Sequence, residues 1–244
     1  MNDGIAGVVA LMRQRLDELP TEFEHRRIFL GTYLRTTQAV GTAIERACFE
    51  DPEWVEDWDV KFAELYLDAH DADLAGRSTA RPWRLAFDAP ADLPPLRHVL
   101  LGINAHVNYD LPQALLAVIS DEDFTDAGLM DRRRRDHERI DGVLAERVGA
   151  EDNALGGARS LVDRVLTPLN RLSSQRFLRE SRQKVWHNTA ELQRARLDGP
   201  TAYATRLAEL ELLSAAKIAD LLRPGQVLLR LAITGFGVTL PPPA

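Results

Sequence analysis

The residues best suited to carry chemistry lie on one apolar segment, His98 to Pro112 (HVLLGINAHVNYDLP). Because an α-helix has 3.6 residues per turn, His106 and Asp110 would lie one turn apart on the same face. A histidine and a carboxylate at that spacing can share one proton or bind one metal ion. We therefore predict His106 as a metal ligand or general base and Asp110 as its catalytic partner. Two structural interpretations stay open: His106 as a hydrogen-bonded core residue, and Asp110, followed by Pro112, as the N-cap of a second helix.

Two asparagines interrupt the same apolar segment. Asn104 and Asn108 lie one turn apart, where packing alone would select leucine or isoleucine, and burying an amide costs free energy unless hydrogen bonds satisfy it. Asn188 lies on the apolar stripe of a later helix in the same way. We predict that these amides orient a substrate; the alternative is a buried network that fixes helix register. Gly102 costs about 1 kcal/mol relative to alanine in a helix interior, so we expect a neighbouring element to approach closely there.

Polar residues also line one edge of the apolar stripe on the helix predicted to begin at Pro52. Asp59 is our candidate for a second catalytic carboxylate, and Tyr66 for a substrate-binding hydroxyl. The structural interpretation is an ordinary amphipathic boundary. The nearby acidic cluster, Asp68 to Asp73, is similar to the acidic helices that hold magnesium in prenyl-diphosphate enzymes. That functional class would require these carboxylates to face a deep apolar cavity.

The histidine-then-acid spacing recurs at His137 and Asp141 and at His187 and Glu191. On a helical wheel His187 and Glu191 face away from the apolar stripe, so we predict that they form a solvated surface pair. Asp136 and His137 flank the stripe of their helix, and either could face inward.

Helical periodicity recurs along most of the chain, whereas strand patterns are scarce. We predict an all-α fold, one domain over residues 1–244 with about eight helices around a central apolar helix at about 96–110. Four prolines make 76–95 the main irregular loop. A longer helix is expected from Pro168 to Ala195. The proline-rich tail, 238–244, is predicted to be frayed.

Composition limits the classes of partner. The 244 residues are 45% apolar, with 30 Lys and Arg against 37 Asp and Glu, a net charge of −7, which disfavours nucleic-acid binding. No apolar run approaches the roughly 20 residues of a membrane span. No signal peptide is recognised and Cys48 is the single cysteine, so we expect a reducing cytoplasm. Nucleotide-binding and serine-hydrolase motifs are absent, which leaves a small molecule as the expected ligand. The oligomeric state stays open.

Around His106 the chain resembles a bacterial family of uncharacterised helical proteins, the DUF family numbered 5995. The N-A-H-I-x-x-D-L-P core of that family is matched by Asn104, Ala105, His106, Val107, Asp110, Leu111 and Pro112. An upstream D-x-x-F-A-x-L-Y-x-D-A segment is matched by Asp59, Phe62, Ala63, Leu65, Tyr66, Asp68 and Ala69. A downstream W-x-N segment is matched by Trp186 and Asn188. The resemblance covers about residues 28 to 220 and implies no activity.

A fainter likeness is to the helical zinc-dependent phospholipase C and single-strand nuclease group, which places an H-x-x-x-D pair on a central helix. His106 and Asp110 match that pair. Those enzymes hold three zinc ions with several further histidines. With His187 facing outward, this chain has few histidines left, so the likeness implies one or two metal ions at most.

The leading functional hypothesis is an enzyme that uses metal-assisted or His/Asp acid–base chemistry on a small apolar or phosphorylated molecule in an interhelical pocket. Its cofactor would be one divalent metal ion, zinc or magnesium. The competing hypothesis is a non-catalytic helical binding or scaffold protein in which the same polar network is structural. Magnesium-dependent prenyl-diphosphate chemistry is the third.

Overall fold

The computed structural model describes residues 4–154 and 175–242, and within these ranges every regular element is helical, which confirms the all-α prediction. The α-helices are α1 (Gly4–Asp17), α2 (Arg27–Glu45), α3 (Pro52–Leu74), α4 (Arg81–Phe87), α5 (Pro95–Ala105), α6 (Leu111–Val118), α7 (Ala127–Ala154), α9 (Gln175–Asp198), α10 (Pro200–Leu222) and α11 (Val227–Thr234). The part of the helix predicted from Pro168 that precedes Gln175 lies outside the described residues.

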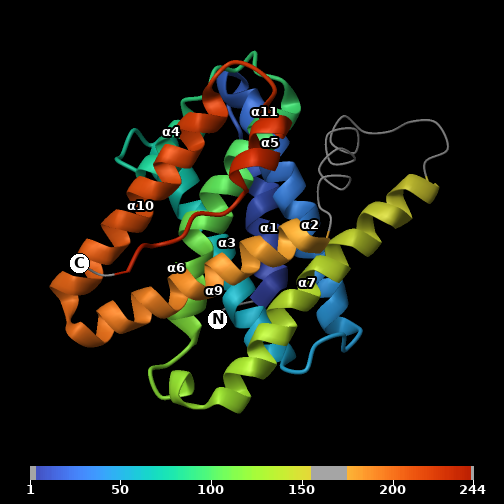
Figure 1. Cartoon of the computed structure of the whole chain (residues 1–244). Helices are drawn as coiled ribbons and strands as arrows, with labels where there is room; N and C mark the ends of the chain where they lie inside the picture. Colours follow the sequence, from blue (N-terminus) through green and yellow to red (C-terminus); the bar gives the residue numbers. More distant parts are fainter. Residues whose placement is uncertain (1–3, 155–174, 243–244) are drawn as a thin grey trace.

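A single helical rod runs through the middle of the protein. It consists of α5, a π-helical turn over His106–Asp110 and α6. Helices α2, α4 and α10 pack against α5, whereas α3 and α9 pack against α6 (Figure 1). These neighbours explain why apolar side chains occur nearly all the way around the rod, since each contact buries a different face of it. This arrangement confirms the predicted central helix.

The π turn has a cause in the sequence. Pro112 has no backbone N–H, and in a regular α-helix its ring would clash with the carbonyl of Asn108. A wider turn before the proline removes that conflict, and such turns recur at functional sites. The backbone of Asp110 is helical (φ −79°, ψ −40°) and its side chain does not cap α6. Asp110 therefore occupies the N-cap position of α6, as predicted, but its side chain does not act as the cap.

The close approach expected at Gly102 is present. A Cβ atom on Gly102 would lie 2.3 Å from Cδ2 of Phe29, so the ring of Phe29 on α2 packs directly against the backbone of α5. Only glycine permits this contact, which brings the aromatic core of α2 and α3 close to the central rod.

Two segments expected to be irregular are more ordered than predicted. Helix α4 lies inside 76–95, where Pro82 occupies the first turn and so permits a helix instead of preventing one. In the tail, Leu240 is only 1% exposed and side chains bond the backbone of 238–241, so these residues are not frayed. Residues 243–244 lie outside the described part.

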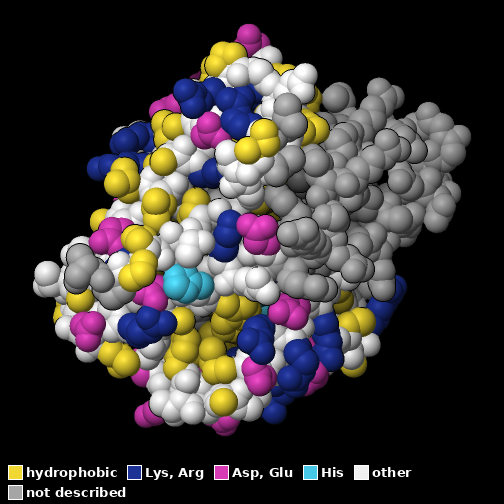
Figure 2. Space-filling model, viewed as in Figure 1, with side chains coloured by type: hydrophobic (Ala, Val, Ile, Leu, Met, Phe, Trp, Pro, Cys, Tyr) yellow, Lys and Arg dark blue, Asp and Glu magenta, His cyan; other side chains and the backbone are white. Residues whose placement is uncertain are grey.

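The surface gives no simple electrostatic signature. Basic and acidic side chains are intermingled over the face in Figure 2. Among the described residues no helix is both long and apolar enough to cross a membrane.

Candidate active site

The predicted His106–Asp110 pair forms, and a third residue completes it. Nδ1 of His106 lies 2.8 Å from Oδ2 of Asp110, and Nε1 of Trp83 donates a hydrogen bond of 2.8 Å to the same oxygen. The π turn keeps the two residues of the pair on one side of the rod, and α4 brings Trp83 to them. The Trp83 N–H fixes the Asp110 side chain, whose contact with Nδ1 in turn orients the imidazole.

Five aromatic rings surround this imidazole, and we call them the aromatic cage. The Phe62 ring stacks on His106 with centroids 3.4 Å apart and planes 3° apart, and the Tyr33 ring meets it edge-on at 4.5 Å. The other three rings, at centroid distances of 5.8 to 6.2 Å, are Phe29, Tyr66 and Trp83. The cage holds one ring nitrogen, Nε2, in an apolar environment, and within the described chain this atom has no hydrogen-bond partner.

Burial dominates the electrostatics of the pair. It lowers the pKa of His106 well below its usual value and raises the pKa of Asp110, an increase that the Trp83 hydrogen bond partly opposes. The imidazole is therefore neutral near pH 7. If Nδ1–H donates to Asp110, Nε2 carries a lone pair, which a general base requires.

Asp59, the predicted second carboxylate, is buried in the same region. It lies on α3, one turn before Phe62, and is 4% exposed. Burial raises its pKa to about 7, and its Oδ2 atom bonds to none of the described residues. The charges of Asp59 and Asp110 both raise the pKa of Tyr33, so the two carboxylates act on one neighbour.

The structure places the predicted amides away from this site. Asn104 bonds to the Leu100 carbonyl and to Asn108 along the rod, on the side opposite His106. Asn108 and Asn188 both bind the backbone of residues 235–241, an extended segment that we call the strap. Of the predicted substrate-binding residues, only Tyr66 touches His106.

The ligands expected for a metal ion are not grouped. Zinc sites use at least three protein ligands, and no group of three or more His, Cys, Asp or Glu side chains is found in the ranges 4–154 and 175–242. Nδ1 of His106 already bonds to Asp110. The donor set of the described residues therefore does not fit a resident zinc ion.

The acidic cluster on α3, predicted as a possible magnesium site, pairs with arginines instead. Asp71 forms a bidentate pair with Arg15, and Asp73 lies 2.7 Å from Arg26, whereas Asp68 is exposed. Asp71 and Asp73 therefore bind arginines, and among the described residues none of the three carboxylates belongs to a group that could hold a metal ion.

The predicted surface pair of His187 and Glu191 is wrong in one member. Glu191 is 5% exposed and lies 2.7 Å from the buried Arg206 of α10. His187 is exposed, as predicted, and its ring lies 3.0 Å from the Leu240 carbonyl oxygen. The helical wheel predicts that this face of α9 points outward, but α10 covers it at Glu191.

Both residues left open on α7 face inward. Asp136 accepts hydrogen bonds from the backbone N–H groups of Glu50 and Asp51 and so fixes the start of α3. His137 packs between the rings of Trp58 and Trp186, and neither of its nitrogens bonds to a described residue.

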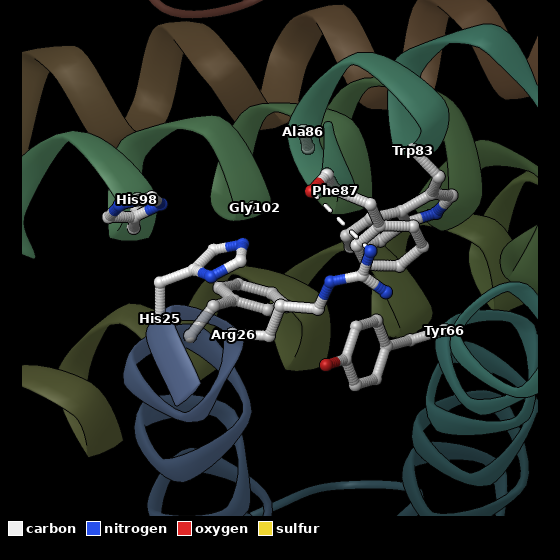
Figure 3. A pocket seen from close by; sticks show the side chains of 9 residues that line it. His25, Arg26, Tyr66, Trp83, Ala86, Phe87, His98 and Gly102 are labelled. Carbon is white, nitrogen blue, oxygen red and sulfur yellow. Dashed lines mark hydrogen bonds between the residues drawn. The ribbon is translucent and has the colours of Figure 1, made fainter. Parts of the chain in front are cut away.

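A small cavity borders the aromatic cage. Its volume is about 20 Å³, enough for about one water molecule. It is lined by Phe29, Tyr66 and Trp83 of the cage and also by His25, Arg26 and His98 (Figure 3). The three shared rings form the wall between this cavity and His106. A displacement of these rings would connect the two.

A family model for a family of unknown function (DUF5995) matches residues 5–224. The chain belongs to that family. The matched region includes the His106–Asp110 pair, Trp83 and Asp59. No curated protein and no solved structure matches the chain.

Sequence reasoning missed Trp83 and most of the cage. Trp83 lies in a segment with a high proline content, where Arg81–Phe87 is too short for periodicity to identify a helix. The one available signal was Pro82, which is typical of the first turn of a helix.

Proposed function

We propose that this protein is an acid–base enzyme in which Nε2 of His106 removes a proton from a small apolar substrate. The observation that supports this is the buried Nε2 atom, held in an aromatic cage while Nδ1 bonds to a carboxylate. A core histidine kept only for packing would gain about 1 kcal/mol or more from a second hydrogen bond. Here Asp110 fixes the ring, and Trp83 fixes Asp110, as expected for an oriented base.

Asp59 is the proposed proton donor. A pKa of about 7 leaves a substantial protonated fraction at neutral pH, as general acids require. In the proposed cycle, His106 takes a proton from the substrate and Asp59 gives one to the product or leaving group. His106 then releases its proton to solvent and Asp59 takes one up, which restores both residues. The net reaction class is an isomerisation or elimination that needs no cofactor.

The substrate class follows from the cage. The phenyl, phenol and indole rings around His106 favour a flat apolar or aromatic substrate. They disfavour a phosphorylated substrate, because a phosphate group would lose its hydration there without gaining cationic partners at these rings. Entry requires ring movement, since His106 is 3% exposed. Gating motions of this kind are common in enzymes.

A general-base probe tests the proposal. The base takes the C–H proton of 5-nitrobenzisoxazole, the N–O bond breaks, and its electron pair leaves on the phenolate, which is coloured. We expect the wild type to accelerate this reaction, and His106→Gln and Asp110→Asn to lower the rate by about 10-fold or more. The matched control is His137→Gln, a buried histidine on α7 outside the pair and outside the cage, which should leave the rate unchanged. Equal rates in all four proteins, each with a native circular dichroism spectrum, would exclude His106 as a base.

The second candidate is a non-catalytic helical protein in which these groups specify the fold. It is favoured by the closure of the site and by the amides of Asn108 and Asn188, which are fully used in binding the strap. In that case His106→Gln would lower the free energy of unfolding and leave the probe reaction at the rate of the His137→Gln control.

A further inference from the structure

The strap is bound by side-chain amides in the way that an extended peptide is bound. Asn108 donates to the Phe236 carbonyl (3.3 Å) and accepts from the Val238 N–H (3.2 Å). Asn188 donates to the Val238 carbonyl (3.0 Å) and accepts from the Leu240 N–H (2.9 Å). The two amides therefore bind alternate residues of the strap through both backbone groups, as a neighbouring β-strand would.

Basic side chains complete the recognition of the strap backbone. Lys184 donates to the Gly237 carbonyl (3.2 Å), and Arg206 donates to the Pro241 carbonyl (2.6 Å). His187 lies 3.0 Å from the Leu240 carbonyl. Because these contacts reach main-chain atoms, they do not depend on which side chains the bound segment carries.

The side chains of the strap supply the selectivity. Phe236 and Leu240 are buried at 5% and 1% exposure, whereas Thr239 between them is exposed. A Cβ atom on Gly237 would lie 2.8 Å from Cδ of Lys184, so the backbone of the strap lies close to α9 there. The groove therefore fits a large apolar residue, a small residue directly after it, and leucine at the fifth position.

The family match includes the side chains that line the groove but not the strap that occupies it. The side chains that bind the strap, from Asn108 to Arg206, lie inside the matched range 5–224, whereas the strap lies outside it. The strap follows the short helix α11 through Gly235, whose φ of +72° suits glycine and marks a sharp change of direction (Figure 1). The side chains that line the groove thus lie within the family match, whereas the strap lies beyond it.

We propose that this groove is a binding site for extended peptides and that residues 235–241 are an intramolecular occupant that a peptide of the same chemistry can replace. The partner is a protein segment in extended conformation with an aromatic residue, then glycine, then leucine three positions after the glycine and proline next. This inference does not depend on the proposed function of His106.

The test uses a fluorescein-labelled synthetic peptide with the sequence of residues 234–242 and the full-length chain. The strap competes with it at an effective concentration on the order of millimolar. The double variant Phe236→Ala, Leu240→Ala weakens the strap and leaves the groove intact. We expect it to bind the peptide at least 10-fold more tightly than the wild type. Adding Asn188→Ala should weaken that binding 10-fold or more.

Two peptide variants separate specific from general binding. A peptide with Thr239→Ala should bind as the parent peptide does, because this side chain is exposed, and one with Leu240→Ala should bind at least 10-fold more weakly. Two results would overturn the proposal: no binding to a double variant that keeps its helical circular dichroism spectrum, and binding that Asn188→Ala leaves unchanged.

A measurement on the wild type keeps the test decisive if the double variant does not fold. Hydrogen exchange of the amides of residues 236–240 is followed with and without excess unlabelled peptide. Displacement predicts at least twofold faster exchange in the strap and unchanged exchange in α10. Unchanged exchange in the strap at millimolar peptide would refute replacement.

Discussion

Replacing Asp59 by asparagine tests the electrostatics of the site most quantitatively. The carboxyl of Asp59 has a pKa of about 7 in the folded protein, because burial disfavours its charge, against 3.8 for an ordinary aspartate. The folded state therefore binds this proton more tightly than the unfolded state does. The contribution of Asp59 to wild-type stability should consequently fall as the pH rises from about 4 to about 7, and stay level above that. Asparagine keeps the shape of the side chain and removes the titration.

The size of the effect follows from the same values. Between pKa values of 3.8 and about 7, ionisation of Asp59 costs about 4 kcal/mol of folding free energy. Asp59→Asn should thus be about 4 kcal/mol more stable than the wild type at pH 8, whereas at pH 4 this contribution disappears. Other buried groups titrate in both proteins and cancel from the difference.

Urea denaturation from pH 4 to pH 8.5, followed by circular dichroism, measures this difference. Asp57→Asn, on the same helix but exposed, is the matched control and should follow the wild-type profile. Parallel profiles for wild type and Asp59→Asn would show that Asp59 is charged without cost. The acid role proposed for it would then lose its basis.

Three further predictions concern packing, a second histidine and metals. Gly102→Ala should destabilise the fold by about 1 to 3 kcal/mol in thermal unfolding, because the added methyl group would lie 2.3 Å from Phe29. In the control Gly142→Ala the added methyl group has no atom within 4 Å, so the fold should be up to about 1 kcal/mol more stable. Equal effects of the two substitutions would refute this prediction. Burial lowers the pKa of His137 well below its usual value, so in acid the unfolded chain takes up a proton at this residue and the folded chain does not. His137→Phe should therefore raise the free energy of unfolding in urea, and by more at pH 5 than at pH 8. A difference that does not change with pH would contradict this prediction. The purified protein should contain less than one zinc or magnesium ion by elemental analysis, and its melting temperature should not change with EDTA; a stoichiometric ion would overturn the assignment of the donor set.

The sequence was sufficient to predict what local periodicity controls. The all-α fold, the central rod and the pairing of His106 with Asp110 all follow from spacing along one helix. The close approach at Gly102 follows from the cost of glycine within that helix. The π turn was not predicted, because it results from a conflict between Pro112 and the carbonyl of Asn108 and not from a hydrophobic pattern.

What could not be predicted depends on which element covers which face. A helical wheel gives the direction of a side chain but not its neighbour, so Glu191 was assigned to solvent although α10 places Arg206 against it. The amides of Asn108 and Asn188 were correctly expected in buried positions, but their partners are backbone groups of the strap, far away in sequence. Short elements held by tertiary contacts, such as α4 and the strap, carry almost no local signal.

The protonation of His106 tests the central claim most directly. Nitrogen-15 NMR of histidine-labelled protein, with His106→Gln to assign the resonances, distinguishes a protonated ring nitrogen from one with a lone pair. We predict that between pH 6 and pH 8 Nδ1 carries the proton shared with Asp110 and Nε2 has the shift of an unprotonated nitrogen. A protonated Nε2 over that range would mean that His106 cannot accept a proton from a substrate, and the acid–base account would be wrong.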